Sequence, residues 1–360
     1  MPSLPTTPES ESSSSLASQA STSVAQVLVL PSPDPPPMLA GQVDATRAWT
    51  GVRLDPARWR VALPEDVVAE LRRDADMLDA HAPIAEMPAP SAAEAPACVA
   101  FAKALRRSVE RAPGFVLISG LPLQEWGDEI AIRAFWRLGR LLSRPVATKW
   151  DGTMLYDVVD TGKRFGAGVR GSATNVELSF HTDNAFGPAL PDFVGLLCVR
   201  PALSGGVSRV CSLYTVHEAL RRRDPRLLQR LYRPAYYDRQ AEHAADAPPT
   251  MRAPLFAYDG EKLSARLTPN LIRRGYAQIG EPMDAALAEA MEALEEVLAD
   301  PALSGEFAMR AGDMQFLNNH WIAHYRSAFQ DMPEKGDDLA RGRRVIRVWY
   351  RDCGSPAYDG

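Results

Sequence analysis

The amino-acid sequence predicts an α+β fold with a double-stranded β-helix, or jelly-roll, core that helices flank. Segments typical of strands are interspersed with segments typical of helices, without the regular βαβ repeat of a doubly wound parallel sheet. The chain also has no glycine-rich phosphate loop between a strand and a helix. Both observations favour an antiparallel β core over a Rossmann-type sheet, and the jelly-roll is one architecture of that kind.

The first 40 residues differ in composition from the rest of the chain. They are rich in Ser, Thr and Pro, and such a segment cannot bury enough apolar surface to offset its ordering entropy. We therefore expect a disordered tail over residues 1–40 and a single globular domain over residues 41–360. A transit peptide is disfavoured because the first 22 residues contain no Arg and include Glu9 and Glu11.

Within the globular part, each element is predicted from its apolar spacing and its boundary residues. Two apolar runs, 193–199 and 207–213, flank a Pro- and Gly-containing connection and predict a β-hairpin. Helices are expected near 64–71, 96–111, 128–142, 214–222, 225–232 and 283–299. Further strands are expected at 114–120, 305–310, 313–318, 320–326 and 343–350. No internal repeat is present.

Composition limits the classes of partner. The chain is 46% apolar and 24% charged with a net charge of -5, so it offers no bulk attraction to nucleic acid or anionic lipid. No apolar stretch reaches the roughly 20 residues that span a bilayer. We expect a cytoplasmic protein with a small-molecule substrate, and the sequence is compatible with a homo-oligomer. The four cysteines have no regular spacing, which indicates reduced thiols and no zinc ribbon; they are Cys98, Cys198, Cys211 and Cys353.

The segment Phe180-His181-Thr182-Asp183 is the most informative part of the sequence. In an extended chain, side chains alternate between faces, so His181 and Asp183 point the same way and can bind one metal ion. Such a tripeptide alone is weak evidence, and an ordinary surface pair is the simpler interpretation. However, the chain has only six histidines, and two of them, His320 and His324, lie in a predicted strand–turn–strand segment that could present a third ligand. Spacing alone does not choose between these two.

The last predicted strand carries two arginines. If residues 343–349 are extended, Arg343 and Arg347 share a face, and two guanidiniums on a core strand are costly without an anionic partner. A dicarboxylate would satisfy them through bidentate contacts. The alternative is an Arg-rich edge strand that pairs with surface acids such as Asp337 and Asp338.

In this order, the motifs resemble the taurine dioxygenase (TauD/TfdA-type) family of Fe(II)/2-oxoglutarate-dependent oxygenases, over roughly residues 110–351. The resemblance implies that His181, Asp183 and His324 are the iron ligands at the catalytic centre. It also implies that Arg343 binds the distal carboxylate of 2-oxoglutarate, with Ser208 beside it. Arg347 matches a second arginine near the cosubstrate or an acidic substrate. The segment between His324 and Arg343 is longer than in compact members, which bears on the register of the two arginines. Glu177 lies in a region that the family uses for substrate contacts, so taurine is not inferred as the substrate.

The cofactors that this resemblance implies are Fe(II), 2-oxoglutarate as cosubstrate and O2. The expected reaction hydroxylates a C–H bond of a small, anionic or amino-acid-like substrate and releases succinate and CO2. The carboxylate Asp183 argues against halogenation, but desaturation and ring formation stay open. The alternative function is a jelly-roll zinc protein, binding or hydrolytic, that uses the same His/Asp/His site. Candidates for lining the substrate pocket are Trp150, Tyr156, Phe165, Asn175 and Glu177.

Overall fold

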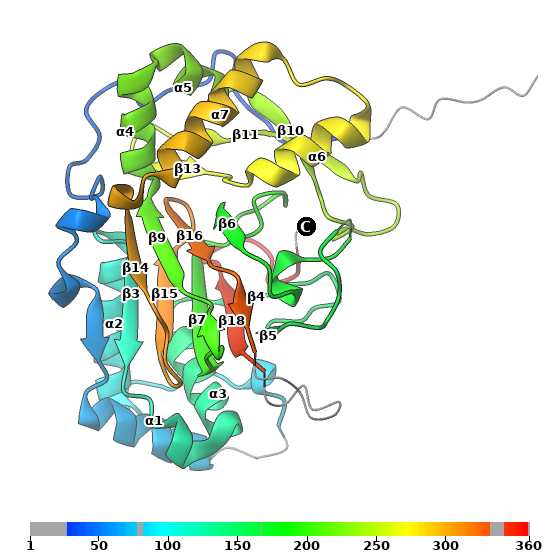
Figure 1. The fold of residues 1–360 in the computed structure, drawn as a ribbon. Coiled ribbons are helices and arrows are strands. Elements are labelled where there is room, and N and C mark those ends of the chain that lie inside the picture. The colour runs from blue at the N-terminus through cyan, green and yellow to red at the C-terminus, as the bar shows by residue number, and fades with distance from the viewer. Residues whose placement is uncertain (1–26, 78–81, 167, 332–341, 359–360) are drawn as a thin grey trace, which may run out of the picture.

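Two mainly antiparallel sheets form the centre of the molecule in the computed structural model, which describes residues 27–77, 82–166, 168–331 and 342–358 (Figure 1). The major sheet has the order β2 (Arg60–Ala62), β3 (Phe115–Ser119), β15 (Met314–Asn318), β7 (Phe193–Arg200), β18 (Arg344–Tyr350) and β4 (Pro145–Val146), and β5 (Tyr156–Val158) also pairs with β18. The minor sheet has the order β14 (Ser304–Phe307), β9 (Ser208–Ser212), β16 (Ile322–Arg326) and β6 (Leu178–His181). The chain crosses between the sheets after β7 and again after β15.

Helices cover the sheets at opposite ends of the molecule (Figure 1). One face of the major sheet is covered by α1 (Glu65–Met77), α2 (Pro96–Glu110) and α3 (Leu123–Leu142). At the other end lie α4 (Leu213–Arg223), α5 (Pro225–Leu231), α6 (Pro269–Ile279) and α7 (Ala285–Ala299). Short 3-10 helices are Gly51–Arg53, Pro56–Arg58, Ile84–Glu86, Gly171–Ala173 and Pro301–Leu303. Among the described residues, no helix has both the length and the apolar character needed to cross a membrane.

Smaller groups of strands complete the fold. A three-stranded sheet has the order β1 (Val27–Val29), β11 (Thr250–Pro254) and β10 (Pro234–Asp238). Two ribbons are β12 (Phe256–Tyr258) with β13 (Leu263–Ala265), and β8 (Ser204–Gly205) with β17 (Phe329–Gln330). The β1 strand and the backbone N–H of Leu39, which donates to the Tyr232 hydroxyl at 3.3 Å, fall inside the segment predicted as a tail. The division into a tail and one domain stays a prediction, and residues 1–26 lie outside the described residues.

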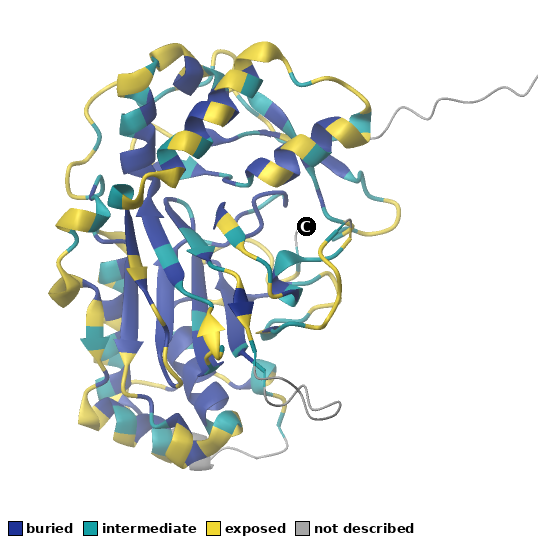
Figure 2. Ribbon diagram, in the orientation of Figure 1, coloured by how far each residue is buried: buried dark blue, intermediate teal, exposed yellow. Residues whose placement is uncertain are grey.

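Strand alternation divides the apolar core between the two faces of the major sheet. In β3, Phe115 and Leu117 pack into the cluster that fills the space between the sheets and the α4–α7 end. Val116 and Ile118, on the other face, pack with α1, α2 and α3. Because successive side chains of a strand point to opposite faces, one apolar run serves both clusters. Figure 2 shows the resulting buried strands beneath helices that expose only their outer faces.

The predicted hairpin between residues 193–199 and 207–213 is wrong. The first segment forms β7, which pairs with β15 and β18, whereas the second forms β9, which pairs with β14 and β16 in the other sheet. The connection instead turns at Gly205 and Gly206, whose φ angles are 72° and 66°, and β8 pairs with β17. A residue with a Cβ is strained at such angles, so the glycines allow the chain to leave one sheet for the other.

Candidate active site

Three potential metal ligands meet where strands β6 and β16 lie side by side. His181 ends β6 and is the direct cross-strand partner of His324 in β16, and their rings are 4.2 Å apart between centroids. The Nε2 atoms of His181 and His324 lie 3.5 Å and 3.6 Å from Oδ1 of Asp183. One donor atom from each residue therefore falls within 4.8 Å of the others. The expected convergence of the distant His324 on the His181–Asp183 pair is present.

The backbone after β6 holds this geometry. The hydroxyl of Thr182 accepts a hydrogen bond from the Leu267 N–H at 3.0 Å and donates to the Ala265 carbonyl at 3.2 Å. Thr182 thus points away from its two neighbours, as strand alternation predicts. The backbone N–H of Asp183 donates to the Asn319 side-chain oxygen at 2.8 Å, and the Asn319 amide donates back to the Asp183 carbonyl at 2.9 Å. Asn319 therefore fixes the carboxylate ligand from the turn that precedes β16.

The protonation states suit a divalent cation. Nδ1 of His181 lies 2.8 Å from the Ser179 carbonyl, so this nitrogen carries the proton and Nε2 has a free lone pair. Burial, and then the neighbouring His181, lower the pKa of His324, which keeps its ring neutral. Burial raises the pKa of Asp183, but Arg347 and the two histidines outweigh it and hold that pKa well below its usual range. Two neutral imidazoles and one carboxylate are the forms that bind metal.

His320, the alternative third ligand, lies in another part of the molecule. It occurs in the turn between β15 and β16, and its Nε2 is 2.8 Å from Oδ1 of Asp192. Both residues line a separate cavity that includes Arg106 and Lys262. Of the two histidines that spacing left open, only His324 joins His181 and Asp183.

A small buried cavity of about 50 Å³ lies behind the metal-binding triad, between the two sheets. Its lining includes His324, Ser208, Gln315, Arg326 and Arg343. Among the described residues, Arg343 Nη1, Arg326 Nε and Nη1, and both amide atoms of Gln315 have no hydrogen-bond partner. Buried polar groups are normally paired, so several unpartnered atoms on residues that line one cavity indicate a polar ligand.

The charge in this cavity is positive. The guanidiniums of Arg326 and Arg343 lie over the same ring, Phe329, at 4.7 Å and 5.2 Å from its centroid. Burial, and then Arg343, lower the pKa of Arg326 to about 9. Gly206 packs closely against one of these arginines, because a Cβ there would come within 3.3 Å of Arg343 Nε. A carboxylate is the ligand class that would pair with both guanidiniums.

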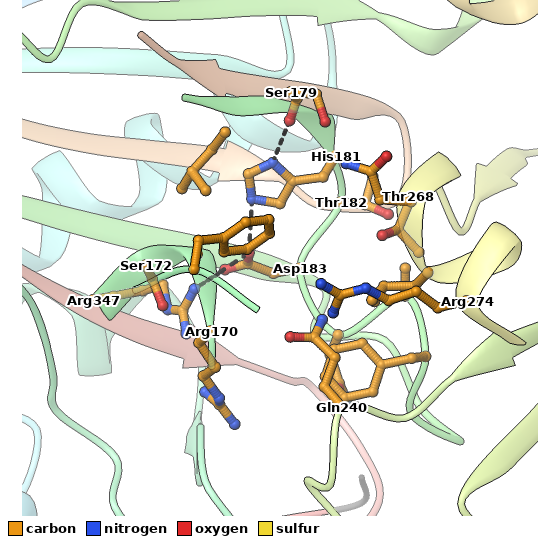
Figure 3. Close-up of a pocket in the computed structure, with 18 of the residues that line it drawn as sticks. Arg170, Ser172, Ser179, His181, Thr182, Asp183, Gln240, Thr268, Arg274 and Arg347 are labelled. Atoms are coloured by element: carbon orange, nitrogen blue, oxygen red, sulfur yellow. Dashed lines mark hydrogen bonds and ion pairs between the residues drawn. The ribbon is translucent and has the colours of Figure 1, made fainter. Parts of the chain in front are cut away.

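A second, more open cavity of about 180 Å³ reaches the triad from the other side (Figure 3). His181, Asp183 and Arg347 form its inner wall, and Arg347 also lines the smaller cavity. Helix α6 contributes Arg274, whose guanidinium points into the cavity in Figure 3. Gln240 lies beside it with a φ angle of 54°, a strained value for a non-glycine residue. The wall also holds Arg170, which pairs with Glu242 at 2.5 Å.

Several site residues were not predicted from the sequence. Trp349 contacts Asp183 and lies two residues after Arg347 on β18, so alternation along the strand was an available signal. Gln315 was a polar residue inside an otherwise apolar strand segment. Arg274 was missed because helix α6 was not expected, although Thr268 before Pro269 and Gly280 after Ile279 were available signals for that helix. Of the suggested pocket residues, Phe165 and Glu177 line the open cavity, whereas Trp150, Tyr156 and Asn175 do not.

Two histidines and one carboxylate on a β core, open to a cavity on one side, are the donor set of mononuclear non-haem iron oxygenases. The family described as Taurine catabolism dioxygenase TauD, TfdA family matches residues 91–349 of this sequence. The chain therefore belongs to that family, and it is a non-haem dioxygenase that uses Fe(II), 2-oxoglutarate and O2.

Individual relatives agree with this membership. FR-33289 synthase of Streptomyces rubellomurinus is 27% identical over 244 residues, which cover 67% of this chain and 70% of the relative. A structure of asparagine oxygenase with Fe(II), 3-hydroxyasparagine and succinate has a TM-score of 0.60 at 19% identity, covering 81% of this chain and 93% of the other. The non-haem iron oxygenase OrfP with Fe and α-ketoglutaric acid has a TM-score of 0.59 at 19% identity, covering 82% and 94%. These two structures share the mixed helix-and-sheet fold.

Proposed function

We propose that His181, Asp183 and His324 hold Fe(II), and that the enzyme hydroxylates a C–H bond of a small anionic or amino-acid-like substrate. In this proposal the two facing sheets are a double-stranded β-helix with the metal between them. The balanced reaction takes substrate, 2-oxoglutarate and O2 to hydroxylated substrate, succinate and CO2. When bound, the iron supplies the oxidant that removes hydrogen from the substrate.

The observation that carries the proposal is the position of the triad between two different cavities. The inner cavity is small, buried and cationic, as the distal carboxylate of 2-oxoglutarate requires. The outer cavity is open to solvent and suits a substrate. A zinc hydrolase with the same three ligands has no need for a buried Arg343 whose Nη1 has no hydrogen-bond partner among the described residues. The arrangement thus favours an oxygenase over that alternative.

Each side chain of the inner cavity has a separate role in this proposal. Arg343 binds the distal carboxylate of 2-oxoglutarate, with the Ser208 hydroxyl as an additional donor. Arg347 contacts Asp183 and reaches both cavities, so it lies between the cosubstrate and the substrate. Leu178 and Leu196, which line the same cavity, restrict the access of water to the distal carboxylate of 2-oxoglutarate.

The outer cavity supports a substrate that carries charge. Arg274 has one carboxylate near it among the described residues, Asp238, at a distance of 4.0 Å. Its guanidinium is thus available to a carboxylate or another oxyanion. Glu177 lines the same cavity and accepts a hydrogen bond from the Tyr325 hydroxyl at 2.7 Å. A cavity with both signs of charge fits a zwitterionic amino acid. FR-33289 synthase is related to this chain by sequence, and asparagine oxygenase is similar to it in fold.

Replacing Arg343 tests the assignment of the inner cavity. We expect Arg343→Ala to weaken 2-oxoglutarate binding by about 10- to 100-fold, because a charge-assisted contact contributes about 1.5–3 kcal/mol. Anaerobic calorimetry on protein loaded with Mn(II) or Co(II) measures this affinity. Succinate release under Fe(II), ascorbate and O2 measures the turnover that depends on it.

The neighbouring Arg344→Ala variant is the matched control. Arg344 pairs with Asp157 at 2.6 Å and with Asp128 at 3.3 Å, and it lines neither cavity. Its removal should leave 2-oxoglutarate binding unchanged. A larger loss at Arg347 than at Arg343 would move the distal carboxylate to Arg347. Absence of any 2-oxoglutarate binding or turnover by the unmodified protein would reject the oxygenase proposal.

A further inference from the structure

The two oxygens of the Asp183 carboxylate have different surroundings. Oδ2 accepts a hydrogen bond from the indole N–H of Trp349 at 2.6 Å. Oδ1 instead faces Nε2 of His181 and of His324, at 3.5 Å and 3.6 Å. Arg347 does not distinguish the two oxygens, because its Nη1 is 3.4 Å from Oδ1 and 3.3 Å from Oδ2. Trp349 is therefore the side chain that makes the carboxylate asymmetric.

Trp349 is itself held rigidly. It lies in β18, where its backbone is paired with Val194 of β7 and Val146 of β4, and its side chain is 2% exposed. The indole stacks on Tyr358 with ring centroids 6.4 Å apart, and the guanidinium of Arg347 lies 5.0 Å from the indole centroid. The direction of the N–H bond is therefore set by the major sheet.

The acceptor is fixed as well, from the turn between β15 and β16. Asn319 binds both backbone groups of Asp183, and the Asp183 side chain is 3% exposed. Donor and acceptor thus come from two elements that pack independently of any ligand. The hydrogen bond between them is short and involves a charged acceptor, which places it among the strong hydrogen bonds of proteins.

We propose that Trp349 is a positioning residue that restricts Asp183 to binding the metal through Oδ1 alone. The inference rests on the proposed metal site and goes further, because that site would also form with a bidentate carboxylate. For Oδ2 to bind the metal, the carboxylate would have to turn away from Trp349. Its buried N–H would then lose its only described acceptor, which is unfavourable.

The number of carboxylate oxygens on the metal affects the chemistry. On a bound metal ion, two imidazoles and one carboxylate oxygen would leave positions for the two chelating oxygens of 2-oxoglutarate and for O2. A second carboxylate oxygen would take one of those positions. Trp349 therefore preserves room for the cosubstrate without touching it.

The variant Trp349→Phe removes the N–H and keeps most of the ring packing. Apoprotein is titrated anaerobically with Co(II), whose visible absorption depends on coordination number, and then with 2-oxoglutarate. We expect Co(II) affinity to fall by about 10- to 100-fold, as for other partners of metal ligands. We also expect a changed Co(II) spectrum and a weaker response to 2-oxoglutarate. These spectra would not change if the tryptophan served packing alone.

Trp49→Phe is the matched control. Trp49 is also a buried core tryptophan, and its indole N–H donates to the Pro113 carbonyl at 2.8 Å, but it lines neither cavity of the site. Its Co(II) affinity and spectrum should equal those of the unmodified protein. A folded Trp349→Phe protein with unaltered Co(II) affinity and spectrum would overturn the inference. If Asp183→Ala also binds Co(II) normally, the proposed metal site itself is wrong.

A measurement on the unmodified protein does not depend on the variant folding. In a crystal structure of the Co(II)-loaded enzyme we expect one Asp183 oxygen, Oδ1, at about 2.2 Å from the metal. Oδ2 should remain hydrogen-bonded to Trp349. Two carboxylate oxygens at bonding distance would refute the role given to Trp349 while leaving the ligand set intact.

Discussion

At the scale of single residues, His217 shows how burial alone changes the chemistry of a side chain outside the active site. It is fully buried in α4, its Nε2 lies 2.9 Å from the Tyr232 hydroxyl, and its ring meets Phe256 edge to face. Burial lowers the pKa of His217 to about 4; the neighbouring Glu218 opposes this shift, and Arg221 adds to it. The folded protein therefore resists protonating a group that the unfolded chain protonates near pH 6.5.

This difference predicts a pH dependence of stability. Because the unfolded state binds the proton more readily, the contribution of His217 is complete above pH 6.5 and is lost as the pH falls toward 4. The shift corresponds to about 3 kcal/mol in the free energy of unfolding. Urea unfolding at several pH values measures it. In His217→Gln, which does not titrate, we expect a smaller loss over this range, and an equally steep loss would contradict the assignment to His217.

Residues that carry chemistry were predictable from the sequence where a short-range rule applied to them. Alternation in an extended segment placed His181 and Asp183 on one face, and the same rule relates Arg347 to Trp349. The choice of His324 over His320 required the cross-strand register, in which His324 faces His181. Register depends on which strands pair, and the sequence does not determine that locally.

At the scale of elements, the contact between helix α3 and the major sheet depends on a glycine. A Cβ at Gly139 would lie 1.9 Å from the Tyr350 hydroxyl oxygen and 2.7 Å from its Cζ. Tyr350 is fully buried in β18, so it has little room to move. The helix can approach the sheet this closely only because residue 139 has no side chain.

We therefore expect Gly139→Ala to destabilise the protein by about 1–3 kcal/mol, because of overpacking. This outcome is opposite to helix propensity, which favours Ala over Gly by about 1 kcal/mol. Thermal or urea unfolding measures the change. In a double-mutant cycle, Tyr350→Phe removes the closest atom, so part of the penalty should disappear. A Gly139→Ala protein as stable as the unmodified chain would show that the contact is loose.

Elements with continuous apolar patterns were predicted well, and those defined by long-range pairing were not. The expected helices near 96–111 and 283–299 correspond to α2 and α7, and the strand at 343–350 corresponds to β18. Helix α6 was missed although Thr268 before Pro269 and Gly280 after Ile279 are start and stop signals for a helix. The predicted hairpin failed because two adjacent strands joined different sheets.

At the scale of the whole molecule, the outer cavity lies where the β core meets the α4–α7 end. The core supplies His181, Asp183 and Arg347, whereas α6 and the segment after β10 supply Arg274 and Gln240. The proposed function thus places chemistry and substrate recognition on different parts of the fold. Changes at the α6 side can alter which substrate binds without moving the metal ligands.

This separation predicts a selective effect of Arg274→Ala. Once small amino acids and organic anions have been screened for stimulated succinate release, we expect the variant to lower kcat/KM for the active substrate by about 10- to 100-fold. Its KM for 2-oxoglutarate should not change. Arg273→Ala is the control, because Arg273 lies next to Arg274 but pairs with Glu295 at 2.5 Å and lines neither cavity. Equal effects of the two substitutions would exclude a substrate contact at Arg274.

The paired arginines over Phe329 have a consequence for the lifetime of the protein as well as for its catalysis. Arg326 and Arg343 repel one another across a shared aromatic ring until an anion enters between them. A ligand that binds only the folded chain adds to its stability in proportion to the logarithm of its concentration. With 2-oxoglutarate bound between these arginines as proposed, the enzyme should thus resist denaturation and proteolysis most strongly when 2-oxoglutarate is abundant.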